Sequence, residues 1–406
     1  MKDEKKNMPK VRFSGFSDAW ELRKLSTEFE KVNERNDGSL GKEHWISVAK
    51  MYFQNPDKVQ SNNIDTRTYV MRTGDIAFEG HPNKEFKFGR FVANDIGRGV
   101  VSELFPIYRH KQEYNNYYWK NAIQIERVMG PIFAKSITSS GNSSNKLDPN
   151  HFLRQQVFIP KIEEQNKIGM FFKQFDDTVA LHQRKLEALK EMKKGFLQQL
   201  FPQKGEKVPR VRFADFHDEW ELRKVLEMSK ESFGGGTPKT GNEEYWQGNF
   251  PWIQSSDIIK EQLYNVKPTK FITEEAIKNS ATKVIPGNSI AIVTRVGVGK
   301  LALISFAFAT SQDFISLSKL NVDNYFGVYS LYQMLQKQLN NIQGTSIKGI
   351  TKKELLEKKL QIPLQIDEQQ NIGTFFKQAD NTIILQQNKL EQLKILKKTY
   401  LQNMFI

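Results

Sequence analysis

The sequence predicts an α+β fold built by tandem duplication, in which each half is a mixed α/β domain followed by one long helix. Three observations carry this prediction: two motifs recur 200 residues further on, a third recurs 204 residues further on, and the third begins a long heptad pattern in both copies. A chain of 406 residues is also longer than a single hydrophobic core usually supports.

The two halves open with the same motifs. Pro9-Lys-Val-Arg-Phe13 returns as Pro209-Arg-Val-Arg-Phe213. Trp20-Glu-Leu-Arg-Lys24 returns as residues 220–224 with no change. Repeats of this kind indicate duplicated structural units.

The middles of the halves have diverged, but they keep traces of one skeleton. Trp45-Ile46 matches Trp252-Ile253, and each pair begins a short run typical of a strand. A turn at Gly74-Asp75 before Ile76 resembles Gly287-Asn288 before Ile290, and both turns lead into apolar strands. The remaining shared features are Gly141-Asn-Ser143 with Ile159-Pro160 in the first half, and Gly344-Thr-Ser346 with Ile362-Pro363 in the second.

The end of each half is a long helix with a heptad pattern. Residues 168–201 align with residues 372–405, and 20 of the 34 aligned positions are identical. Apolar residues recur in alternating steps of four and three, which is typical of a coiled-coil seam. Polar residues interrupt both seams at equivalent places, at His182 and Lys193 and at Gln386 and Lys397. The predicted apolar seam consists of Ile168, Phe172, Phe175, Val179, Leu186, Leu189, Phe196, Ile372, Phe376, Ile383, Leu390 and Leu393.

An apolar stripe of this length needs a partner, and the chain contains one matching stripe. We therefore expect the two helices to pair as an antiparallel coiled coil; the alternative is two helices that each pack on their own domain. The proline-bounded run 202–209 is expected to be an exposed linker. These boundaries place the first α/β domain at 1–158, the first helix at 159–203, the second α/β domain at 204–361 and the second helix at 362–406.

The composition favours a partner of negative charge. Lys and Arg number 60 against 46 Asp and Glu, a net charge of +14 that divides into +8 for residues 1–200 and +6 for residues 201–406. Two basic halves favour a polyanion contacted at two places, and a basic protein without such a partner is the alternative. The chain has no cysteine, no apolar run of 18 residues and no apolar secretory segment at its start, so we expect no disulfide, no membrane span and a cytoplasmic location.

The sequence predicts no catalytic residue and no metal ligand. The run 296–300 lacks the glycine and the hydroxyl residue of a phosphate-binding loop, and the six histidines show no metal-ligand spacing. No Asp-Pro-Pro-Tyr or Asn-Pro-Pro-Tyr loop of an amino-methyltransferase is present. The acidic pairs Glu163-Glu164 and Asp176-Asp177 are expected on solvated helix faces, and the Gly-rich run 234–238 is expected to form a turn. We therefore expect that the chain is not an enzyme.

Basic and polar residues near glycine turns are the candidates for contact with a polyanion, and with a nucleic acid in particular, because such side chains reach phosphates and base edges. In the first domain they are Lys50, Arg67, Arg72, Lys84, Lys87, Arg90 and Arg98. In the second domain they are Thr237, Lys239, Ser255, Ser256, Arg295, Lys300 and Lys348. The aromatic run 114–119 is expected to pack inside the first domain rather than to stack on bases.

These features together resemble the specificity (S) subunit of type I restriction–modification systems, over essentially the whole chain. The resemblance rests on the motif from Pro9 to Glu21 with its copy at 209–221, and on Ile-Pro followed by a Gln-x-x-Ile-Gly-x-Phe-Phe helix start in both halves. It also rests on a series typical of target-recognition domains: Gly235-Gly-Thr-Pro238, Trp246-x-Gly248, Pro251-Trp-Ile253 and Asp257-Ile258. The first domain carries Gly38-Ser39 instead of the Gly-Gly-Thr-Pro run, so its base-reading residues do not follow from the second domain.

The resemblance implies that each α/β domain reads one part of a split, asymmetric site in double-stranded DNA. It implies that the helices set the spacing between the parts and dock two methyltransferase (M) subunits, which restriction/translocase (R) subunits then join. Adenine-N6 methylation and ATP-dependent cleavage would belong to these partners, and so would S-adenosylmethionine, ATP and Mg, with no cofactor bound by this chain. A stand-alone sequence-specific DNA-binding or inhibitory protein of the same fold is one alternative, and a coiled-coil scaffold for proteins is another.

Overall fold

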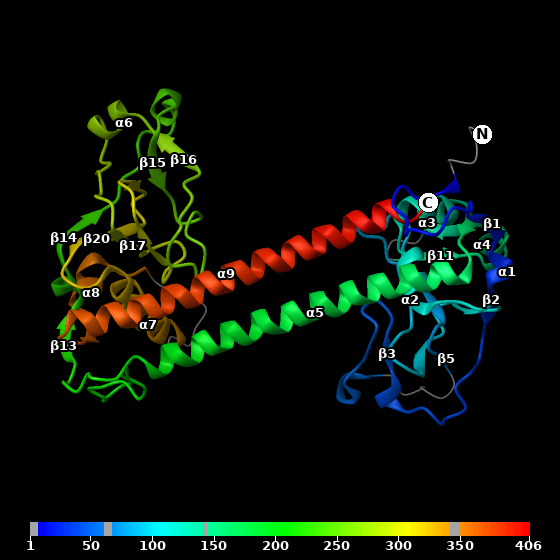
Figure 1. Cartoon of the computed structure of the whole chain (residues 1–406). Coiled ribbons are helices and arrows are strands. Elements are labelled where there is room, and N and C mark those ends of the chain that lie inside the picture. Colours follow the sequence, from blue (N-terminus) through cyan, green and yellow to red (C-terminus); the bar gives the residue numbers. More distant parts are fainter. Residues whose placement is uncertain (1–6, 61–66, 141–143, 342–348) are drawn as a thin grey trace. The chain divides into compact units, whose positions relative to one another are not determined.

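The computed structural model describes residues 7–60, 67–140, 144–341 and 349–406. The chain divides into two compact units, the first made of residues 1–183 with 388–406 and the second of residues 184–387. Two long helices, α5 (Ile162–Gln199) and α9 (Ile366–Asn403), each contribute one part to each unit (Figure 1). Each unit therefore contains the start of one long helix and the end of the other.

The first unit is built on a four-stranded antiparallel sheet in the order β2-β9-β6-β7. Its strands are β2 (Phe29–Val32), β6 (Ile76–Glu79), β7 (Arg90–Ala93) and β9 (Ile107–His110). Smaller ladders join β3 (Ile46–Ser47) to β4 (Tyr52–Phe53), β5 (Thr68–Met71) to β8 (Gly99–Ser102), and β10 (Ile137–Ser140) to β11 (Asn145–Leu147). The short helices are α1 (Leu25–Glu28), α2 (Asn116–Ala122), α3 (Glu126–Ser136) and α4 (Pro149–Arg154).

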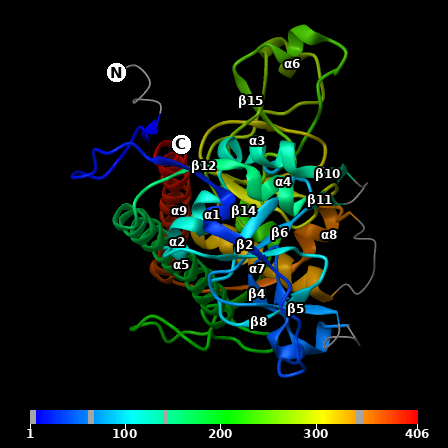
Figure 2. The same cartoon turned by 90° about the vertical axis from the view of Figure 1, so that its right-hand side faces the viewer.

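Aromatic packing forms the core of this unit. Phe91 contacts the rings of Phe78, Tyr108, Phe133 and Phe152, and all five side chains are buried. These residues come from three strands of the sheet and from α3 and α4, so the core joins the sheet to its helices. Figure 2 shows α2 beside the start of α5 within this unit.

The second unit repeats the plan with β14-β20-β17-β18, again antiparallel throughout. Its strands are β14 (Ser229–Gly234), β17 (Ser289–Val293), β18 (Leu301–Ile304) and β20 (Phe314–Leu320). A second sheet has the order β16 (Lys270–Ile272), β15 (Phe250–Ile253), β19 (Ala309–Thr310). The helices are α6 (Glu274–Lys278), α7 (Asn324–Asn341) and α8 (Lys352–Glu357).

The common skeleton predicted from the diverged middles is confirmed by the pairing. Trp45 forms a parallel bridge with Val100, and Trp252 pairs in parallel with Ala309. The predicted turns before β6 and β17 contain Gly74 and Asn288 with φ of 92° and 57°. Residues 141–143 and 344–346, the third shared feature, lie outside the described residues.

The long helices run antiparallel to one another inside each unit. In the first unit, Phe171 and Phe175 of α5 contact Tyr400 of α9, and Asp176 pairs with Lys397. In the second unit, Phe196 of α5 contacts Phe375 of α9, and Lys193 pairs with Asp380. All twelve predicted apolar seam residues are buried or half-buried. That the helices form one coiled coil along their whole length, and the domain boundaries drawn above, stay predictions.

Two expectations were wrong. Glu164 and Asp176 are not solvated: Glu164 is 2% exposed and binds Arg12, and Asp176 is half-buried against Lys397. Pairing with a cation offsets the desolvation cost of burying each carboxylate. The two cations are more than 150 residues away in sequence, so the neighbouring residues gave no sign of them. The Gly-rich run is not a turn, because Gly234 ends β14 and residues 235–239 continue as an irregular segment packed against the backbone of Ala281 and Ser311.

Candidate nucleic-acid interface

The frame of each unit is a buried ion pair that ties the opening motif to the start of a long helix. Nε and Nη2 of Arg12 donate to the two carboxylate oxygens of Glu164, both at 2.7 Å, and Nε1 of Trp20 donates to the same carboxylate at 3.2 Å. The hydrogen bond to Glu164 raises the pKa of Arg12. Such two-point pairing fixes geometry as well as charge.

The second unit repeats this cluster with Arg212, Trp220 and Glu368. Arg212 donates to Glu368 at 2.8 and 2.9 Å, and Trp220 donates to it at 3.2 Å. The repeated arginine and tryptophan of the opening motifs are thereby explained: they hold the chain that precedes each sheet against the helix that follows it.

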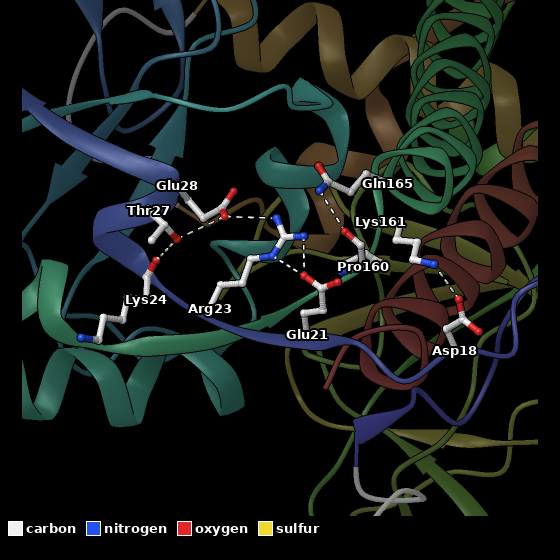
Figure 3. Close-up of polar contacts among 9 residues, drawn as sticks. All are labelled: Asp18, Glu21, Arg23, Lys24, Thr27, Glu28, Pro160, Lys161 and Gln165. Atoms are coloured by element: carbon white, nitrogen blue, oxygen red, sulfur yellow. Dashed lines mark hydrogen bonds and ion pairs between the residues drawn. The ribbon is translucent and has the colours of Figure 1, made fainter.

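A two-stranded ladder beside this cluster closes each unit. β1 (Glu21–Lys24) pairs with β12 (Gln156–Ile159), and β13 (Glu221–Lys224) pairs with β21 (Lys359–Ile362). Figure 3 shows Arg23 of β1 between Glu21 and the buried Glu28, with Lys161 on Asp18 nearby. The second unit keeps the Arg223–Glu221 pair and places Gln365 on Asp218 where the first unit has Lys161.

A contact that occurs in both halves holds a short helix against the start of the long helix of the same unit. The Gln165 amide donates to the Pro160 carbonyl, as drawn in Figure 3, and accepts from the backbone N–H of Asn115. Asn115 in turn caps α2 by accepting from the N–H of Tyr118. A Cβ on Gly169 would overlap the Asn115 side chain, so glycine is required at this point of α5.

The second unit carries the same device. Gln369 donates to the Pro363 carbonyl at 3.0 Å and accepts from the N–H of Asp323 at 2.9 Å. Asp323 accepts from the N–H of Phe326 in α7, and a Cβ on Gly373 would lie 2.6 Å from its carboxylate. The repeated Gln-x-x-Ile-Gly motif therefore positions α2 and α7, and with them the sheets.

In the second unit, four predicted DNA contacts lie together at the tip between β17 and β18. Arg295 is exposed in this tip, and Lys300 at its end donates to the carbonyl of Ser255 at 3.2 Å. Ser256 follows and is exposed. The neighbouring Val296 is 70% exposed, although the sequence analysis did not select it.

Two further candidates of this unit lie on the Gly-rich segment. The Thr237 hydroxyl donates to Gln312, and Lys239 is exposed. A Cβ on Gly235 would overlap the Ser311 carbonyl and one on Gly236 the Ala281 carbonyl, so both positions need glycine. The turn 311–313 links this segment to the tip, because the Asp313 carbonyl accepts from the N–H of Thr294. Lys348 lies outside the described residues.

In the first unit, the connection between β6 and β7 gathers three candidates. Lys84 and Lys87 are exposed on this connection, and Arg90 begins β7. Nη2 of Arg90 donates to the carbonyl of Ala49, next to the exposed Lys50. The structure thus brings Lys50, Lys84, Lys87 and Arg90 to one edge of the unit.

The other three candidates lie at the ends of the β5–β8 ladder. Arg67 precedes β5, whereas Arg72 and Arg98 flank its other end, since Met71 pairs with Gly99. Arg72 is already paired with Glu34 at 2.8 Å. Hydrogen bonds from Arg72 and Arg109, opposed by partial burial, lower the pKa of Glu34.

Exposed aromatic residues at the first edge were missed by the sequence analysis. Tyr52 and Phe53 form β4 and are 47% and 38% exposed. A strand of two residues has no periodicity to read, and its exposure depends on the hairpin around Met51, whose φ is 47°. The expectation for the run 114–119 is confirmed at Tyr118 and Trp119, which are buried in the core.

Two kinds of site, a metal site and a phosphate-binding loop, can be compared with the described residues. The described residues contain no group of three or more His, Asp or Glu side chains placed to hold a metal ion. Residues 296–300 form a hairpin tip instead of the strand-to-helix loop that cradles phosphate. Among the described helices, none combines the length and the apolar character needed to cross a membrane.

Comparison with known families gives a match over most of the chain. A family model described as "Type I restriction modification DNA specificity domain" matches residues 100–191 and 217–395. The type I restriction enzyme MjaIX specificity subunit of Methanocaldococcus jannaschii is 31% identical over 194 residues, which is 45% of this chain and 42% of that protein. The chain therefore spans less than half of that relative in the alignment.

Three longer matches cover nearly the whole chain. The putative type I restriction enzyme MjaX specificity subunit of the same organism is 23% identical over 97% of this chain and 95% of its own length. The crystal structure of a type I restriction–modification system S subunit from M. genitalium has a TM-score of 0.60 at 13% identity, and the match covers 98% of this chain and 99% of that one. A chain from a study of complex assembly in the type I R-M system has a TM-score of 0.57 at 17% identity, covering 95% and 97%. These two structures share the fold.

Proposed function

Because this chain belongs to the family of type I restriction–modification DNA specificity domains, we propose that it is the non-catalytic subunit that selects DNA sequence in such a complex. Each unit recognises one part of a bipartite, asymmetric site in double-stranded DNA. The observation that carries this proposal is the pair of sheets with matching strand order, each followed by one long helix and each presenting different loops. Matching frames with different loops suit two readers of different sequences.

The basic residues at the two edges support this role. Lys50, Lys84 and Lys87 are exposed in the first unit, and Arg295 and Lys239 are exposed in the second. Cations at such edges neutralise phosphates and give affinity without sequence information, whereas polar groups beside them read base edges. The formal charge of +14 agrees with a polyanionic ligand.

The long helices set the spacing and dock two methyltransferase subunits. Leu181 of α5 and Leu385 of α9 hold equivalent positions in the two copies, and they are 58% and 69% exposed. Because the two copies keep a leucine exposed at the same position, the two helices offer equivalent partners the same contact. Basic side chains near them, among them Arg184 and Lys389, are exposed as well.

The partners carry the chemistry. The methyltransferase subunits bind S-adenosylmethionine and methylate adenine N6, and the restriction/translocase subunits use ATP and Mg for cleavage. This chain binds no cofactor and acts in the cytoplasm. Its own contribution is to decide which sequence the partners engage.

The decisive experiment is co-expression with a type I methyltransferase subunit, followed by genome-wide mapping of methylated adenines. A bipartite asymmetric motif is the expected result. The alternative function is a stand-alone DNA-binding or inhibitory protein of this fold. Failure to co-purify with a methyltransferase, together with sequence-selective DNA binding and no new methylation, would replace our proposal with that alternative.

The role of the helices in spacing has its own test. Seven residues inserted after Gln183 and seven after Gln387 lengthen each helix by about 10.5 Å, close to the rise of three base pairs. The gap between the two parts of the methylated motif is then expected to grow by about three base pairs. An unchanged gap in a variant that still methylates would show that the helices do not set it.

A further inference from the structure

Both units use a basic side chain to fasten one loop to another at the candidate interface. In the first unit, Arg90 donates from Nη2 to the carbonyl of Ala49 at 2.5 Å. In the second, Lys300 donates from Nζ to the carbonyl of Ser255 at 3.2 Å. Each carbonyl belongs to the segment that follows the Trp-Ile pair shared by the two halves.

The two basic residues hold equivalent places in the sheets. Arg90 lies opposite Glu79 in the β6–β7 ladder, and Lys300 lies opposite Val293, whose N–H it accepts on its own carbonyl. Both are therefore the residue at which the chain returns from the hairpin tip into the sheet. Their spacing in sequence is 210 residues, unlike the 200 and 204 of the preserved motifs, so the contact has persisted while the loops around it changed length.

The contact directs what each edge presents to solvent. In the first unit it holds the hairpin of Lys50, Tyr52 and Phe53 against the tip that carries Lys84 and Lys87. Exposed aromatic rings next to lysines suit nucleic acid, because rings stack on or wedge between bases while lysines meet phosphates.

The second unit presents a different surface on the same support. Lys300 holds the segment of Ser255 and Ser256 against the tip that carries Arg295 and the exposed Val296. A hydroxyl pair, an arginine and an aliphatic side chain are groups that read base edges and thymine methyls. The two units therefore share the contact from a basic side chain to a backbone carbonyl, but they differ in the exposed side chains that would contact bases.

We propose that Arg90 and Lys300 are positioning residues for sequence recognition, each holding the loop after the Trp-Ile pair in place so that loop and hairpin tip together form the reading edge of its unit. This inference rests on the proposed function. It assigns the reading edges to residues 49–53 with 81–89 and to residues 255–256 with 294–299. Both basic side chains act through the protein groups they contact and not through a base: Lys300 through the Ser255 carbonyl, and Arg90 through the Ala49 carbonyl, Glu79 and the Phe86 ring.

The test uses the full chain in its methyltransferase complex and first establishes the motif of the unmodified protein. If no motif appears at that stage, the proposed function fails, whatever the role of Arg90. Given a motif, Arg90→Ala is expected to relax one part of it, with methylation at mismatched sites rising at least tenfold, and to leave the other part unchanged. Lys300→Ala is expected to relax only the other part.

Matched controls separate positioning from general stability. Lys111 donates to the Ser26 carbonyl in the first unit and Lys352 to the Ser232 carbonyl in the second, and none of these four residues belongs to the assigned reading edges. Alanine at either position is expected to leave both parts of the motif intact. Arg90→Lys and Lys300→Arg keep a hydrogen-bond donor, so these variants are expected to methylate the same motif as the unmodified protein.

Three outcomes overturn the inference. The first is equal relaxation of both parts by either alanine variant. The second is lower methylation overall with an unchanged motif, which would mark a purely structural role. The third is relaxation by the control variants as strong as by Arg90→Ala.

Discussion

Arg12 and Glu164 form a two-point ion pair, with both hydrogen bonds at 2.7 Å, that joins the first residues of the fold to the first turn of α5. The carboxylate is buried and also accepts from Trp20, so it has no exposed face from which water could replace the arginine. The same relationship between Arg212 and Glu368 shows that the duplication preserved the pair as a unit.

Removing one member of this pair is expected to be costly. Arg12→Met leaves the Glu164 carboxylate buried without its cation, which typically lowers the free energy of unfolding by about 3–5 kcal/mol. Urea unfolding of the variant measures this loss. Lys161→Ala is the matched control, because the Lys161–Asp18 pair is exposed and such pairs contribute little to stability. Equal losses in the two variants would contradict the role given to the buried pair.

The polar interruptions of the seam give a second prediction. Lys193 and Asp380 are each 11% exposed, and Asp380 also accepts from the Tyr329 hydroxyl at 2.6 Å. The equivalent Lys397 and Asp176 are 24% and 34% exposed. Lys193→Met is therefore expected to lower stability by about 3–5 kcal/mol and Lys397→Met by clearly less, in thermal or urea unfolding.

A double variant checks the cause of that difference. Lys193→Met combined with Asp380→Leu removes both charges and is expected to recover part of the loss, because an apolar pair costs no desolvation while the buried Tyr329 hydroxyl loses its acceptor. If the double variant were less stable than Lys193→Met alone, the ion pair would not explain the effect.

These pairs also show where the sequence was sufficient and where it was not. The heptad pattern located Lys193 and Lys397 as breaks in the seam, and antiparallel pairing gives each of them an aspartate, whereas parallel pairing in register would oppose the two lysines. Asp176 was nevertheless assigned to solvent, because its neighbour Asp177 made the pair look like a charged face. Aligning one helix against the reverse of the other would have revealed the match.

The candidate interface was less predictable for a physical reason. Repetition in the sequence located the residues that hold each sheet against its long helix, since Arg12, Trp20 and Gly169 recur with fixed offsets. Loops of different length carry the exposed groups, so Tyr52, Phe53 and Val296 left no periodic signal, although all three are exposed at the edges. The equivalence of Arg90 and Lys300 follows from strand register alone.

Glycines in α5 provide a third prediction with an internal control. A Cβ on Gly169 would overlap the side chain that caps α2, whereas a Cβ on Gly195 of the same helix meets nothing within 4 Å. Gly195→Ala is expected to raise stability by about 0.5–1 kcal/mol through helix propensity. Gly169→Ala has the same propensity gain but is expected to lower stability by about 1–3 kcal/mol, because the substituted methyl group displaces Asn115. Circular dichroism melts distinguish the two signs, and stabilisation by both would show that Asn115 yields freely.

The imidazole of His110 supplies a prediction about pH. Its ring stacks on Tyr114 at 3.8 Å and lies against Phe29 and Trp119, and this burial lowers its pKa to about 3. In the unfolded chain a histidine takes up its proton near pH 6.5. Between these two values the unfolded state binds more protons than the folded state, so the contribution is fully present above about pH 6.5 and stability falls as the pH is lowered toward 3. The slope from this one group is at most about 1.4 kcal/mol per pH unit.

His110→Phe keeps an aromatic ring in the stack and removes the titration, so its unfolding free energy is expected to depend less on pH between 6 and 4 than that of the unmodified protein. Urea unfolding at three or four pH values measures the two slopes, and slopes that agree within error would show that His110 takes up its proton in the folded protein near its usual pKa.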